Sequence, residues 1–568
     1  MIILGISCYF HDSAACIIKD GKIIAAAAEE RFTRIKHDNN FPKKAIEFCL
    51  DSLQIAANEI SLISFYEKPL IKFERVLYQH IDNFPKSYRQ FIKTMGPWLG
   101  SKLQLKKILE KEINYFGKIN FVDHHLSHAA SSFYLSPFET ASIVTIDGVG
   151  EWATTTIGKG SGKKIKIEKQ INFPHSLGLL YSTLTTYLGF SANDSEYKVM
   201  GLAAYGNPDI YKEKFDQIVE VFSDGSFQLN MDYFDFDWSK EMPSKKMSKL
   251  LGHPARKKDE IVKKYHEDIA AALQLKLEEV VFNILNQTYK NHKNKNLCLA
   301  GGVALNSVLN GKILSNTPFK KIFIPPDPSD AGAAMGAALY SYTRLTGKLT
   351  NKEKFHPYLG PEYKWYQVEK ELKKYKLKYK FIENDQELID KTAALIKNKK
   401  VIGWFQGRME WGPRALGNRS ILASATTTKM RDIINEKVKK REMFRPFAPV
   451  ILEEETKKYF KTDEYISPSA RWMLMVYPFK EKGIKEVPAV VHVDNSGRLE
   501  TLIREDNPKY YDLVKSYKKK TKIPIIINTS FNVKGEPIVC TPKDAINCFL
   551  TTDIDYLVID NYMVKKGK

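Results

Sequence analysis

The chain of 568 residues is 43% hydrophobic and 27% charged, with a net charge of +21 and an isoelectric point near 9.3. This composition excludes a disordered or fibrous protein and leaves room for about two to four globular domains. Six scattered cysteines without C-x-x-C spacing argue against a disulfide framework and against a cysteine zinc site.

The positive charge comes mostly from lysines spread in small groups. No basic stretch is interleaved with aromatic residues as in a nucleic-acid-binding module, so a nucleic-acid partner is not expected. The first residues lack the basic and apolar regions of a signal peptide, and no apolar run reaches the roughly eighteen residues of a membrane span. We therefore expect a cytoplasmic protein without a membrane partner. Its oligomeric state stays open, with a homodimer as one option.

The N-terminal residues predict a strand, a polar tip and a hairpin. Asp20-Gly21 forms a strong hairpin-turn signal, and His11 and Asp12 occupy the tip between the first two strands. The segment EERFTRIKHDNNFP, which carries Lys36, is expected to be an exposed loop because of its charge density. The three strands are indicated by short apolar runs at residues 2–7, 13–19 and 22–28.

Two histidines four residues apart, His124 and His128, are the main metal-binding signal. In a helix this spacing places both imidazoles on one face, where they can bind one ion. The apolar run 141–146 then predicts a strand that ends in Asp147, and Gly148 follows, so that a phosphate can approach the backbone. The alternative is a pair of structural histidines beside a turn aspartate.

The pattern of strand, tip and hairpin occurs a second time, after a separation of about 140 residues, which makes a weak internal repeat. The strands of this second copy are expected at 141–147, 154–158 and 165–171. Two such units that face each other bring both tips to one cleft. This arrangement resembles the actin-like ATPase and sugar-kinase fold, in which the two tips hold nucleotide phosphates and a metal.

Later segments add polar groups to such a cleft. A helix is expected over 259–290, and a strand over 296–300 leads through a Gly-Gly turn with Gly302 to Asn306. A strand, glycines and a helix N-terminus can hold a phosphate on backbone amides. Asp330 begins a helix of small residues. Its ordinary role is the N-cap, and in an actin-like fold it becomes an additional metal ligand.

The C-terminal part is expected to begin after a lysine-rich linker at 347–384. A strand there leads to QGRMEWGPRALGNRS, which places Arg408 and Arg414 beside glycines. Arginine binds phosphate and carboxylate groups in a bidentate manner, so these residues together with Arg445 and Arg498 predict an anion site. The alternative is a set of solvated surface arginines.

Eleven motifs in a fixed order carry a resemblance to a known family. GISCYFHDSAA, EERFTRIKHDNNFP, DHHLSHAASSFY, IDGVGEWATT, EYKVMGLAAYG, LAGGVALNSVLNGKI and PPDPSDAGAAMGAAL resemble the O-carbamoyltransferases of the nodulation and antibiotic-tailoring type. Their N-terminal domain is similar to the tRNA threonylcarbamoyl-adenosine transferase. WFQGRMEWGPRALGNRSILA, REMFRPFAPV, SGRLETL and INTSFNVKGEPIV resemble that family's YrdC-like C-terminal domain.

The resemblance implies an α/β fold with two domains. A duplicated actin-like (ASKHA) domain is expected over residues 1–346 and an α+β YrdC-like domain over 385–568. The implied reaction has two steps. Carbamoyl phosphate and ATP with Mg2+ give carbamoyl-adenylate in the C-terminal domain, and a hydroxyl of a glycan or natural-product acceptor then takes the carbamoyl group in the N-terminal domain as AMP leaves.

The resemblance also implies roles for individual residues. A divalent transition metal, with Fe2+ favoured, is held by His124, His128, Asp147 and Asp330. His11 is the expected base, because an acceptor alcohol needs one within hydrogen-bond reach, and Asp12 orients the acceptor. The alternative is that both only cap a turn. Carbamoyl-adenylate is expected to contact Lys36, Asp147, Gly148, Gly178, Gly302 and Asn306. ATP and carbamoyl phosphate are expected to contact Arg408, Arg414, Arg445, Arg498, Asn528 and Ser530.

Three other functions stay open at this point. In tRNA threonylcarbamoylation the positive charge serves an RNA partner, but that pathway normally divides the two activities between separate proteins. An actin-like kinase or ATPase has no use for the histidine pair and the arginine-rich C-terminal part. A non-catalytic actin-like scaffold has no need of glycines and acids grouped at the cleft.

Overall fold

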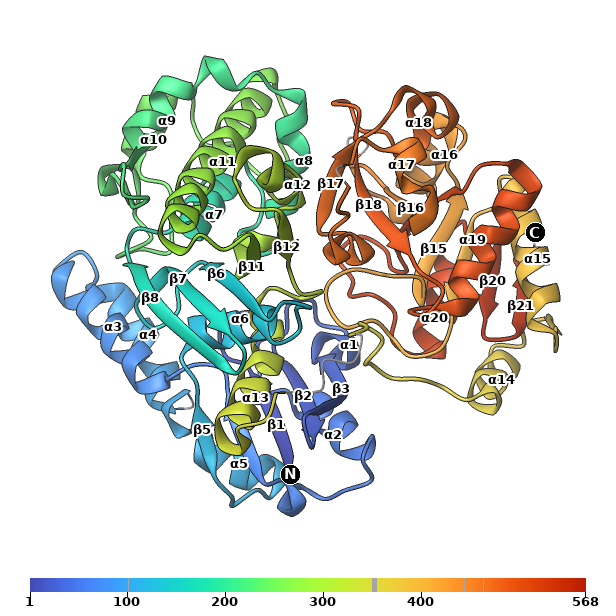
Figure 1. Cartoon of the computed structure of the whole chain (residues 1–568), viewed down its shortest axis with the longest axis horizontal. Coiled ribbons are helices and arrows are strands. Elements are labelled where there is room, and N and C mark those ends of the chain that lie inside the picture. The colour runs from blue at the N-terminus through green and yellow to red at the C-terminus, as the bar shows by residue number, and fades with distance from the viewer. Residues whose placement is uncertain (101, 350–354, 443–444, 463, 568) are drawn as a thin grey trace. The chain divides into compact units, whose positions relative to one another are not determined.

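The computed structural model forms two compact units (Figure 1). Unit 1 consists of Met1–Glu29 and His37–Phe355, and unit 2 of Glu30–Lys36 and His356–Lys568. The residues that the structure describes are 1–100, 102–349, 355–442, 445–462 and 464–567.

The first sheet of unit 1 has the order β3-β2-β1-β4-β5. β1, β2 and β3 form the expected antiparallel hairpins, and β4 and β5 add in parallel on the other side of β1. β1, β2 and β4 are almost entirely buried because their apolar runs are continuous. Their bounds are β1 Ile2–Ser7, β2 Ala14–Lys19, β3 Lys22–Ala28, β4 Leu62–Phe65 and β5 Ile119–Phe121.

The second sheet of unit 1 repeats this topology in the order β12-β11-β6-β7-β8. β6, β7 and β8 are antiparallel neighbours, and β11 and β12 add in parallel to β6. The duplication predicted from the hairpin pattern is therefore confirmed, and with it the actin-like α/β class of this part. The bounds are β6 Thr140–Ile146, β7 Ala153–Ser161, β8 Lys164–Asn172, β11 Asn296–Ala300 and β12 Lys321–Phe323.

Two helices connect the sheets of unit 1. α6 (His124–Phe133) lies against the second sheet, and α13 (Asp330–Thr346) packs on α6 and on the first sheet. The helices approach closely because α13 is rich in small residues. A Cβ atom at Gly336 would lie only 1.9 Å from the carbonyl oxygen of Ser127 on α6. This close packing places the N-terminus of α13 beside the first turn of α6.

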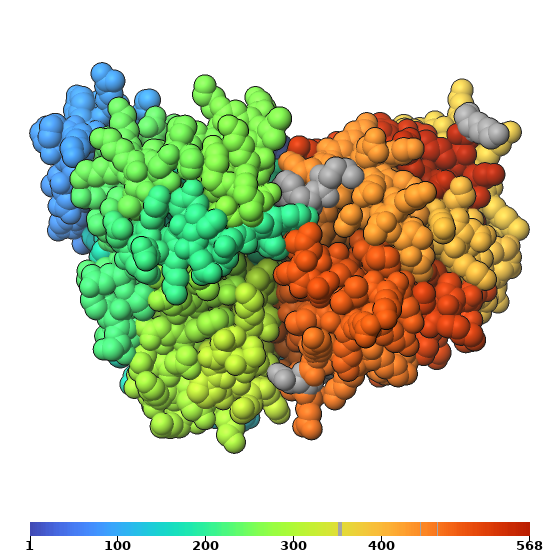
Figure 2. Space-filling view, turned by 90° about the horizontal axis from the view of Figure 1, so that it is seen from above, coloured from blue at the N-terminus to red at the C-terminus, as the bar shows by residue number. Residues whose placement is uncertain are grey.

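The remaining helices of unit 1 cover the sheets and form a helical lobe around α11, the helix expected over 259–290. In the space-filling view side chains fill the gaps between these ribbons (Figure 2). The helices are α2 Lys43–Asp51, α3 Pro69–Asp82, α4 Tyr88–Gly100, α5 Leu105–Ile113, α7 Leu177–Tyr187, α8 Glu196–Leu202, α9 Lys212–Ile218, α10 Lys245–Leu251, α11 Lys264–His292 and α12 Ser307–Asn316. The short 3-10 turn η6 covers Gly302–Leu305, and the ribbon of β9 and β10 covers Val219–Val221 and Phe227–Leu229.

Unit 2 is built on one mixed sheet of order β13-β21-β20-β14-β15-β19-β16-β18-β17. The mixture of parallel and antiparallel neighbours confirms the α+β class of this part. The bounds are β13 Tyr379–Phe381, β14 Ile402–Phe405, β15 Arg419–Ser424, β16 Ala448–Leu452, β17 Met475–Pro478, β18 Ser496–Leu502, β19 Ile525–Ser530, β20 Tyr556–Ile559 and β21 Tyr562–Lys565.

The core of unit 2 lies between this sheet and the helices α15 and α19. Trp404 of β14 and Tyr510 of α19 are fully buried there among aliphatic side chains. The helices are α1 Glu30–Thr33, α14 Trp365–Lys374, α15 Asp385–Lys397, α16 Thr428–Ile433, α17 Thr456–Tyr459, α18 Glu481–Glu486, α19 Pro508–Thr521 and α20 Pro542–Thr551, with the π-helical turn η7 at Ile434–Lys439.

The charged segment after the first hairpin differs from the expected exposed loop. Residues 30–36 pack as part of unit 2, and Arg31 is only 6% exposed. Arg31 pairs with Glu30 at 2.9 Å and donates to the carbonyl of Gly412 at 3.0 Å. Arg34 donates to the carbonyl of Ile538 at 2.6 Å. The charges are buried because each finds a partner, which the charge pattern alone does not reveal.

The stretch predicted as a linker, 347–384, contains both α14 and β13. Residues 350–354 of that stretch lie outside the described residues. Among the described residues, no helix combines the length and the hydropathy that a membrane span requires.

Candidate functional site

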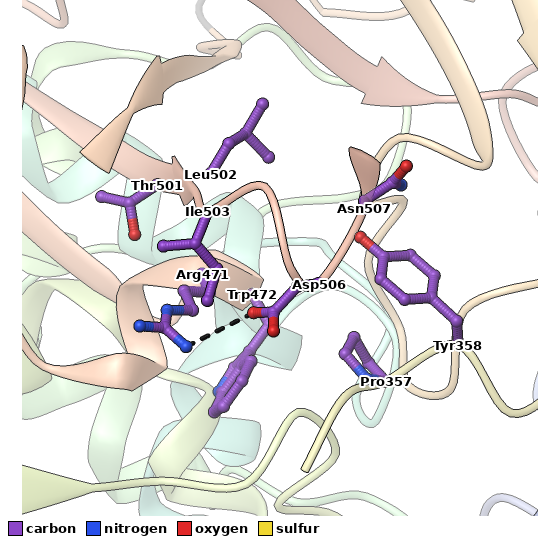
Figure 3. Close-up of a pocket in the computed structure, with 9 residues that line it drawn as sticks. All are labelled: Pro357, Tyr358, Arg471, Trp472, Thr501, Leu502, Ile503, Asp506 and Asn507. Atoms are coloured by element: carbon purple, nitrogen blue, oxygen red, sulfur yellow. Dashed lines mark hydrogen bonds and ion pairs between the residues drawn. The ribbon is translucent and has the colours of Figure 1, made fainter. Parts of the chain in front are cut away.

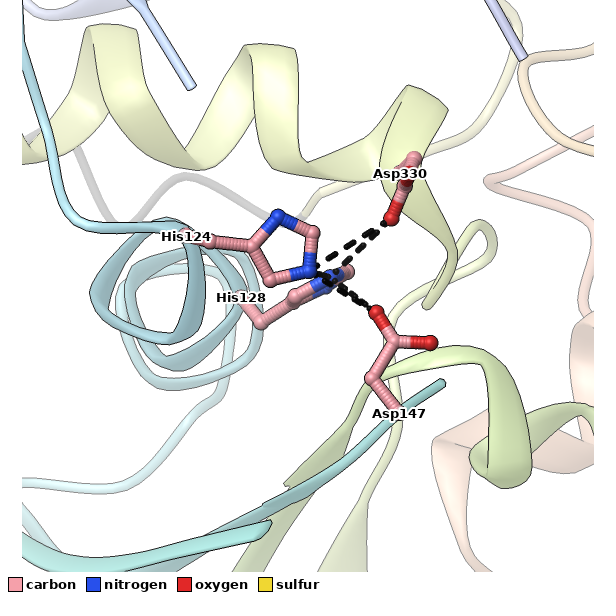
Figure 4. A group of neighbouring side chains, drawn as sticks. All are labelled: His124, His128, Asp147 and Asp330. Carbon is pink, nitrogen blue, oxygen red and sulfur yellow. Dashed lines mark hydrogen bonds and ion pairs between the residues drawn. The ribbon is translucent and has the colours of Figure 1, made fainter. Parts of the chain in front are cut away.

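Four side chains of unit 1 converge on one point (Figure 4). The Nε2 atoms of His124 and His128 lie 3.1 Å apart, and both face Oδ2 of Asp147 at 2.9 and 3.0 Å. Oδ1 of Asp330 lies 3.6 and 3.5 Å from the same two nitrogens. The structure thus brings together all four residues that the sequence suggested as metal ligands, from α6, the end of β6 and the start of α13.

Backbone contacts fix this geometry. Oδ1 of Asp147 accepts from the N–H groups of Gly148 at 2.8 Å and Gly302 at 3.1 Å, so Oδ2 is left for the histidines. The N–H of His124 donates to the buried carboxylate of Glu151 at 3.0 Å, which satisfies a free amide in the first turn of α6. Donors and acceptors outside the cluster therefore hold it in place.

The electrostatics suit a cation. Both imidazoles are fully buried. Burial lowers the pKa of His128, but hydrogen bonds to Asp147 and Asp330 outweigh it and raise the pKa to about 9. Burial raises the pKa of Asp147, and the two histidines outweigh that effect and hold it well below its ordinary value. The second carboxylate oxygen of Asp330 is buried without a hydrogen-bond partner among the residues that the structure describes. Two imidazoles and two carboxylates fit a divalent transition metal.

The intervening His125 has a structural role. Its Nδ1 faces the hydroxyl of Thr145 at 2.7 Å and its Nε2 faces the carbonyl of Ala153 at 2.8 Å. Burial and the neighbouring histidines lower its pKa to about 3, so it stays neutral. It ties α6 to the second sheet.

The glycines expected at the nucleotide site lie around the same strand end. A Cβ atom at Gly178 would lie 2.7 Å from the backbone of Asp147 and Gly148, so the first turn of α7 packs directly on this tip. Asn306 is the N-cap of α12: its side chain accepts from the N–H of Leu309 at 3.0 Å and exchanges hydrogen bonds with Gln274. Lys36, by contrast, belongs to the segment that packs with unit 2.

The first tip of unit 1 carries a second polar cluster. Asp12 accepts from Nδ1 of His11 at 2.8 Å through one oxygen and from Nδ1 of His37 at 2.8 Å through the other. Nε2 of His37 lies 3.0 Å from Oδ1 of Asp194. The sequence suggested His11 and Asp12, but it gave no signal for His37 and Asp194, which are separated by more than a hundred residues.

Arginines gather on β18 and the loops beside it in unit 2. The pKa of Arg498 is well below its ordinary value, first because of burial and then because of the positive charges of Arg414, Arg441 and Arg445. Arg445 also pairs with Glu442 at 3.5 Å. Like charges that face one another at a half-buried position such as that of Arg498 are costly unless an anion joins them. The cluster therefore has the character of a phosphate site.

Two further predicted residues flank these arginines. Asn528 donates through Nδ2 to the carbonyl of Ala415 at 2.9 Å and to the fully buried Glu500 at 2.7 Å. Ser530 accepts from Nζ of Lys439 at 3.2 Å. Burial lowers the pKa of Lys439 well below its ordinary value. Sequence reasoning missed Lys439 and Glu500, because a single lysine or glutamate among many gives no local pattern.

Arg408 contacts the backbone of the loop before α14. It donates to the carbonyls of Gly360 at 3.2 Å and Leu359 at 2.7 Å, and so fastens the loop before α14. Arg419, from the same motif, is fully buried, donates to backbone carbonyls and stacks on Phe405. Two arginines of the motif thus stabilise the fold, while Arg414 faces Arg498.

A small hollow in unit 2 lies between β18 and the loop at Tyr358 (Figure 3). Arg471 forms ion pairs with Asp506 at 3.3 Å and with Glu453 at 3.1 Å. The hydroxyl of Tyr358 donates to the carbonyl of Leu416 at 2.9 Å. Because these polar groups are already partnered, the hollow has the character of internal packing and not of a substrate site.

Comparison with known proteins identifies the family in both units. The family model described as "Carbamoyltransferase N-terminus" matches residues 2–339, and "Carbamoyltransferase C-terminus" matches residues 393–566.

Similar proteins cover almost the whole chain. An uncharacterized protein of Synechocystis is 44% identical over 99% of this chain and 96% of its own length. Nodulation protein NolNO of Sinorhizobium fredii is 38% identical over 98% of this chain and 79% of its own length. An uncharacterized protein of Methanocaldococcus jannaschii is 32% identical over 99% of both chains. With matches of this extent, the chain belongs to the carbamoyltransferase family and is a carbamoyltransferase enzyme.

Proposed function

We propose that this carbamoyltransferase activates carbamoyl phosphate with ATP in unit 2 and transfers the carbamoyl group to an acceptor hydroxyl in unit 1. The acceptor class is a sugar-containing or natural-product alcohol. The observation that carries the proposal is the half-buried Arg498, whose Nε has no hydrogen-bond partner among the described residues and which lies among the charges of Arg414, Arg441 and Arg445. A group of cations held together in this way calls for a highly charged anion, and the phosphates of ATP and carbamoyl phosphate supply one.

The first step makes an activated carbamoyl group. Carbamoyl phosphate is cleaved by water to phosphate and carbamate, and an oxygen of carbamate then attacks the α-phosphorus of ATP. The bond to pyrophosphate breaks, and carbamoyl-adenylate forms. Arg498 and its neighbours stabilise the negative charge on the phosphate oxygens of ATP. The Mg2+ ion that binds with ATP neutralises part of the same charge. Lys439 donates to Ser530 and to Asn532 beside the end of β19, which adds an amine to the same region.

The second step takes place at the four-residue cluster of unit 1. His124, His128, Asp147 and Asp330 are the residues that would hold a divalent transition ion, with Fe2+ favoured. Such an ion, when bound, supplies Lewis acidity that stabilises charge on a phosphate or carbonyl oxygen. The backbone amides beside Asp147, at Gly148 and Gly302, orient that carboxylate.

Proton transfer in the second step falls to the first tip. The acceptor oxygen bonds to the carbamoyl carbon, the bond from that carbon to the phosphate oxygen breaks, and AMP leaves with the electron pair. The hydroxyl proton goes to Nε2 of His11, which is the only ring nitrogen of that histidine not directed at Asp12.

The test of the first step needs no acceptor. Purified protein is incubated with ATP, Mg2+ and carbamoyl phosphate, and pyrophosphate release is followed. We expect release that depends on carbamoyl phosphate and that falls by about a hundred-fold or more in Arg498→Ala, the scale of removing a preorganised charge. Arg504→Ala is the matched control, because Arg504 is 62% exposed and pairs with Asp512 at 3.0 Å. Release without carbamoyl phosphate, or equal release from both variants, would rule the proposal out.

A further inference from the structure

The cluster at the first tip of unit 1 is built from two histidines that share one carboxylate. The rings of His11 and His37 lie 4.7 Å apart between centroids, and each directs Nδ1 at a different oxygen of Asp12. The other ring nitrogen of each histidine also faces oxygen. Nε2 of His11 lies 2.5 Å from the carbonyl of Asn193, and Nε2 of His37 lies 3.0 Å from Oδ1 of Asp194.

These contacts determine where the protons are. A carbonyl oxygen and an ionised carboxylate can only accept hydrogen bonds. Both ring nitrogens of His11 therefore carry a proton in this arrangement, and the same holds for His37 between its two carboxylates. Burial lowers the pKa of His11, but the hydrogen bond and the charge of Asp12 outweigh it and raise the pKa to about 9. The two imidazolium groups are stable side by side because Asp12 lies between them.

The backbone supports this arrangement independently of the side chains. Tyr9, His37 and Asn193 all adopt positive φ angles, of 75°, 54° and 60°, although none is glycine. Such backbone is unfavourable for residues with a Cβ atom and occurs where the surrounding structure holds it. The N–H of Tyr9 donates to the carbonyl of Asn39 at 2.7 Å, which fastens the segment after His37 to the tip.

We propose that His37 and Asp194 are positioning residues for proton transfer from the acceptor, and that the carbonyl of Asn193 occupies the place that the acceptor hydroxyl takes during turnover. This inference rests on the proposed role of His11 in carbamoyl transfer. His37 donates a hydrogen bond to one carboxylate oxygen of Asp12 and so fixes the orientation of that carboxylate. The other oxygen of Asp12 then accepts from Nδ1 of His11 and orients its ring. Asp194 holds His37 in turn.

Nε2 of His11 exchanges one hydrogen-bond partner for another during turnover. In the resting arrangement the N–H of Nε2 donates to the Asn193 carbonyl. When the acceptor enters, its oxygen replaces that carbonyl and the proton of Nε2 passes to solvent, so the ring becomes able to accept. The hydroxyl proton then moves to Nε2 as the new carbon–oxygen bond forms. Three charged groups act on His11 throughout: Asp12 and Asp330 raise its pKa, and His37 lowers it.

The direct test follows the protonation of His11 and not the activity. Protein with 15N-labelled histidines is loaded with Zn2+, which is diamagnetic, and its ring nitrogens are titrated by NMR, with His11 assigned from the His11→Gln variant. In His37→Gln a positive charge beside Asp12 is lost, so the titration midpoint of His11 should move up by about one pH unit. Asp194→Asn removes the carboxylate that stabilises the positive charge of His37. This variant should raise the titration midpoint of His11 as well, but by a smaller amount.

The control is His292→Gln, because His292 also pairs with a carboxylate, Glu168 at 3.0 Å, but lies at the end of α11, which is not part of the cluster at the first tip. That variant should leave His11 unchanged. An unshifted His11 midpoint in both His37→Gln and Asp194→Asn would overturn the inference. Pyrophosphate release is measured in the same samples, so that failure of this inference can be told apart from failure of the proposed function. If pyrophosphate release persists while the titration midpoint of His11 stays unchanged, only the positioning role is contradicted.

Discussion

Asp147 divides its two carboxylate oxygens between two tasks. Oδ1 is held by the amides of Gly148 and Gly302, and Oδ2 faces the Nε2 atoms of both histidines. A carboxylate fixed at one oxygen by backbone cannot turn away from its partners, so the histidines meet a preorganised group. His124 and His128 direct the same ring nitrogen to one point, whereas the adjacent His125 uses both nitrogens inside the fold.

Metal content tests this division between ligands and structural histidines. We expect His124→Ala and His128→Ala each to lose the proposed divalent transition ion, because two imidazoles supply half of the protein donors. His125→Gln should keep the ion and instead lower stability by about 1–3 kcal/mol, since buried hydrogen-bonding groups lose their partners. Elemental analysis of the purified proteins measures the first effect and urea unfolding the second. Loss of metal in His125→Gln alone would contradict the assignment.

At the scale of elements, the features that could be predicted from the sequence are those formed by residues close together along the chain. The hairpin turn at Asp20-Gly21 and the second hairpin after Asp147 give a local pattern, so the duplicated topology could be inferred before any contact was known. The i, i+4 spacing of His124 and His128 is equally local. Asp330 could be added only through the actin-like arrangement, because it lies about two hundred residues further along the chain.

The contacts that could not be predicted from the sequence join residues that lie far apart along the chain. His37 meets Asp194 across 157 residues, and no pattern near either residue indicates this contact. Lys439 reaches Ser530 from a π-helical turn, a geometry that helical periodicity does not describe. Arg31 was expected in solvent, but it is buried, with the backbone carbonyl of Gly412 and the neighbouring acid Glu30 as partners. Burial of charge becomes visible only when the partner is known.

The contact between α6 and α13 offers a test at this scale. Gly336→Val would place side-chain atoms against the carbonyl of Ser127, where even a Cβ would come within 1.9 Å. We expect a loss of about 1–3 kcal/mol in unfolding free energy, as for other overpacked contacts. Because α6 carries His124 and α13 carries Asp330, metal occupancy should fall as well. Gly96→Ala is the control, since nothing lies within 4 Å of its added Cβ. Unchanged unfolding and metal content in Gly336→Val would contradict this packing.

At the scale of the whole molecule, each cluster is complete within one unit. The histidines and carboxylates of the metal-type centre belong to unit 1, and the arginines with Glu500 and Lys439 belong to unit 2. The carbamoyltransferase family models match both parts, over residues 2–339 and 393–566. A chain that contains two separate sets of polar residues is suited to two half-reactions, each with its own charge environment.

Because the two clusters lie in separate units, a single substitution can be expected to affect one half-reaction and not the other. Since the residues that we propose to form the adenylate lie in unit 2, His124→Ala should keep pyrophosphate release within about two-fold of the unchanged protein. AMP release should fall by about a hundred-fold, the scale of losing a charge-stabilising group. Arg498→Ala should lose both products, because no adenylate forms for the second step. Pyrophosphate and AMP are quantified in one reaction mixture by chromatography, and addition of an acceptor alcohol raises only AMP. If His124→Ala abolished pyrophosphate release in a protein that unfolds normally in urea, the two half-reactions would share one site, and the assignment of adenylation to unit 2 would be wrong.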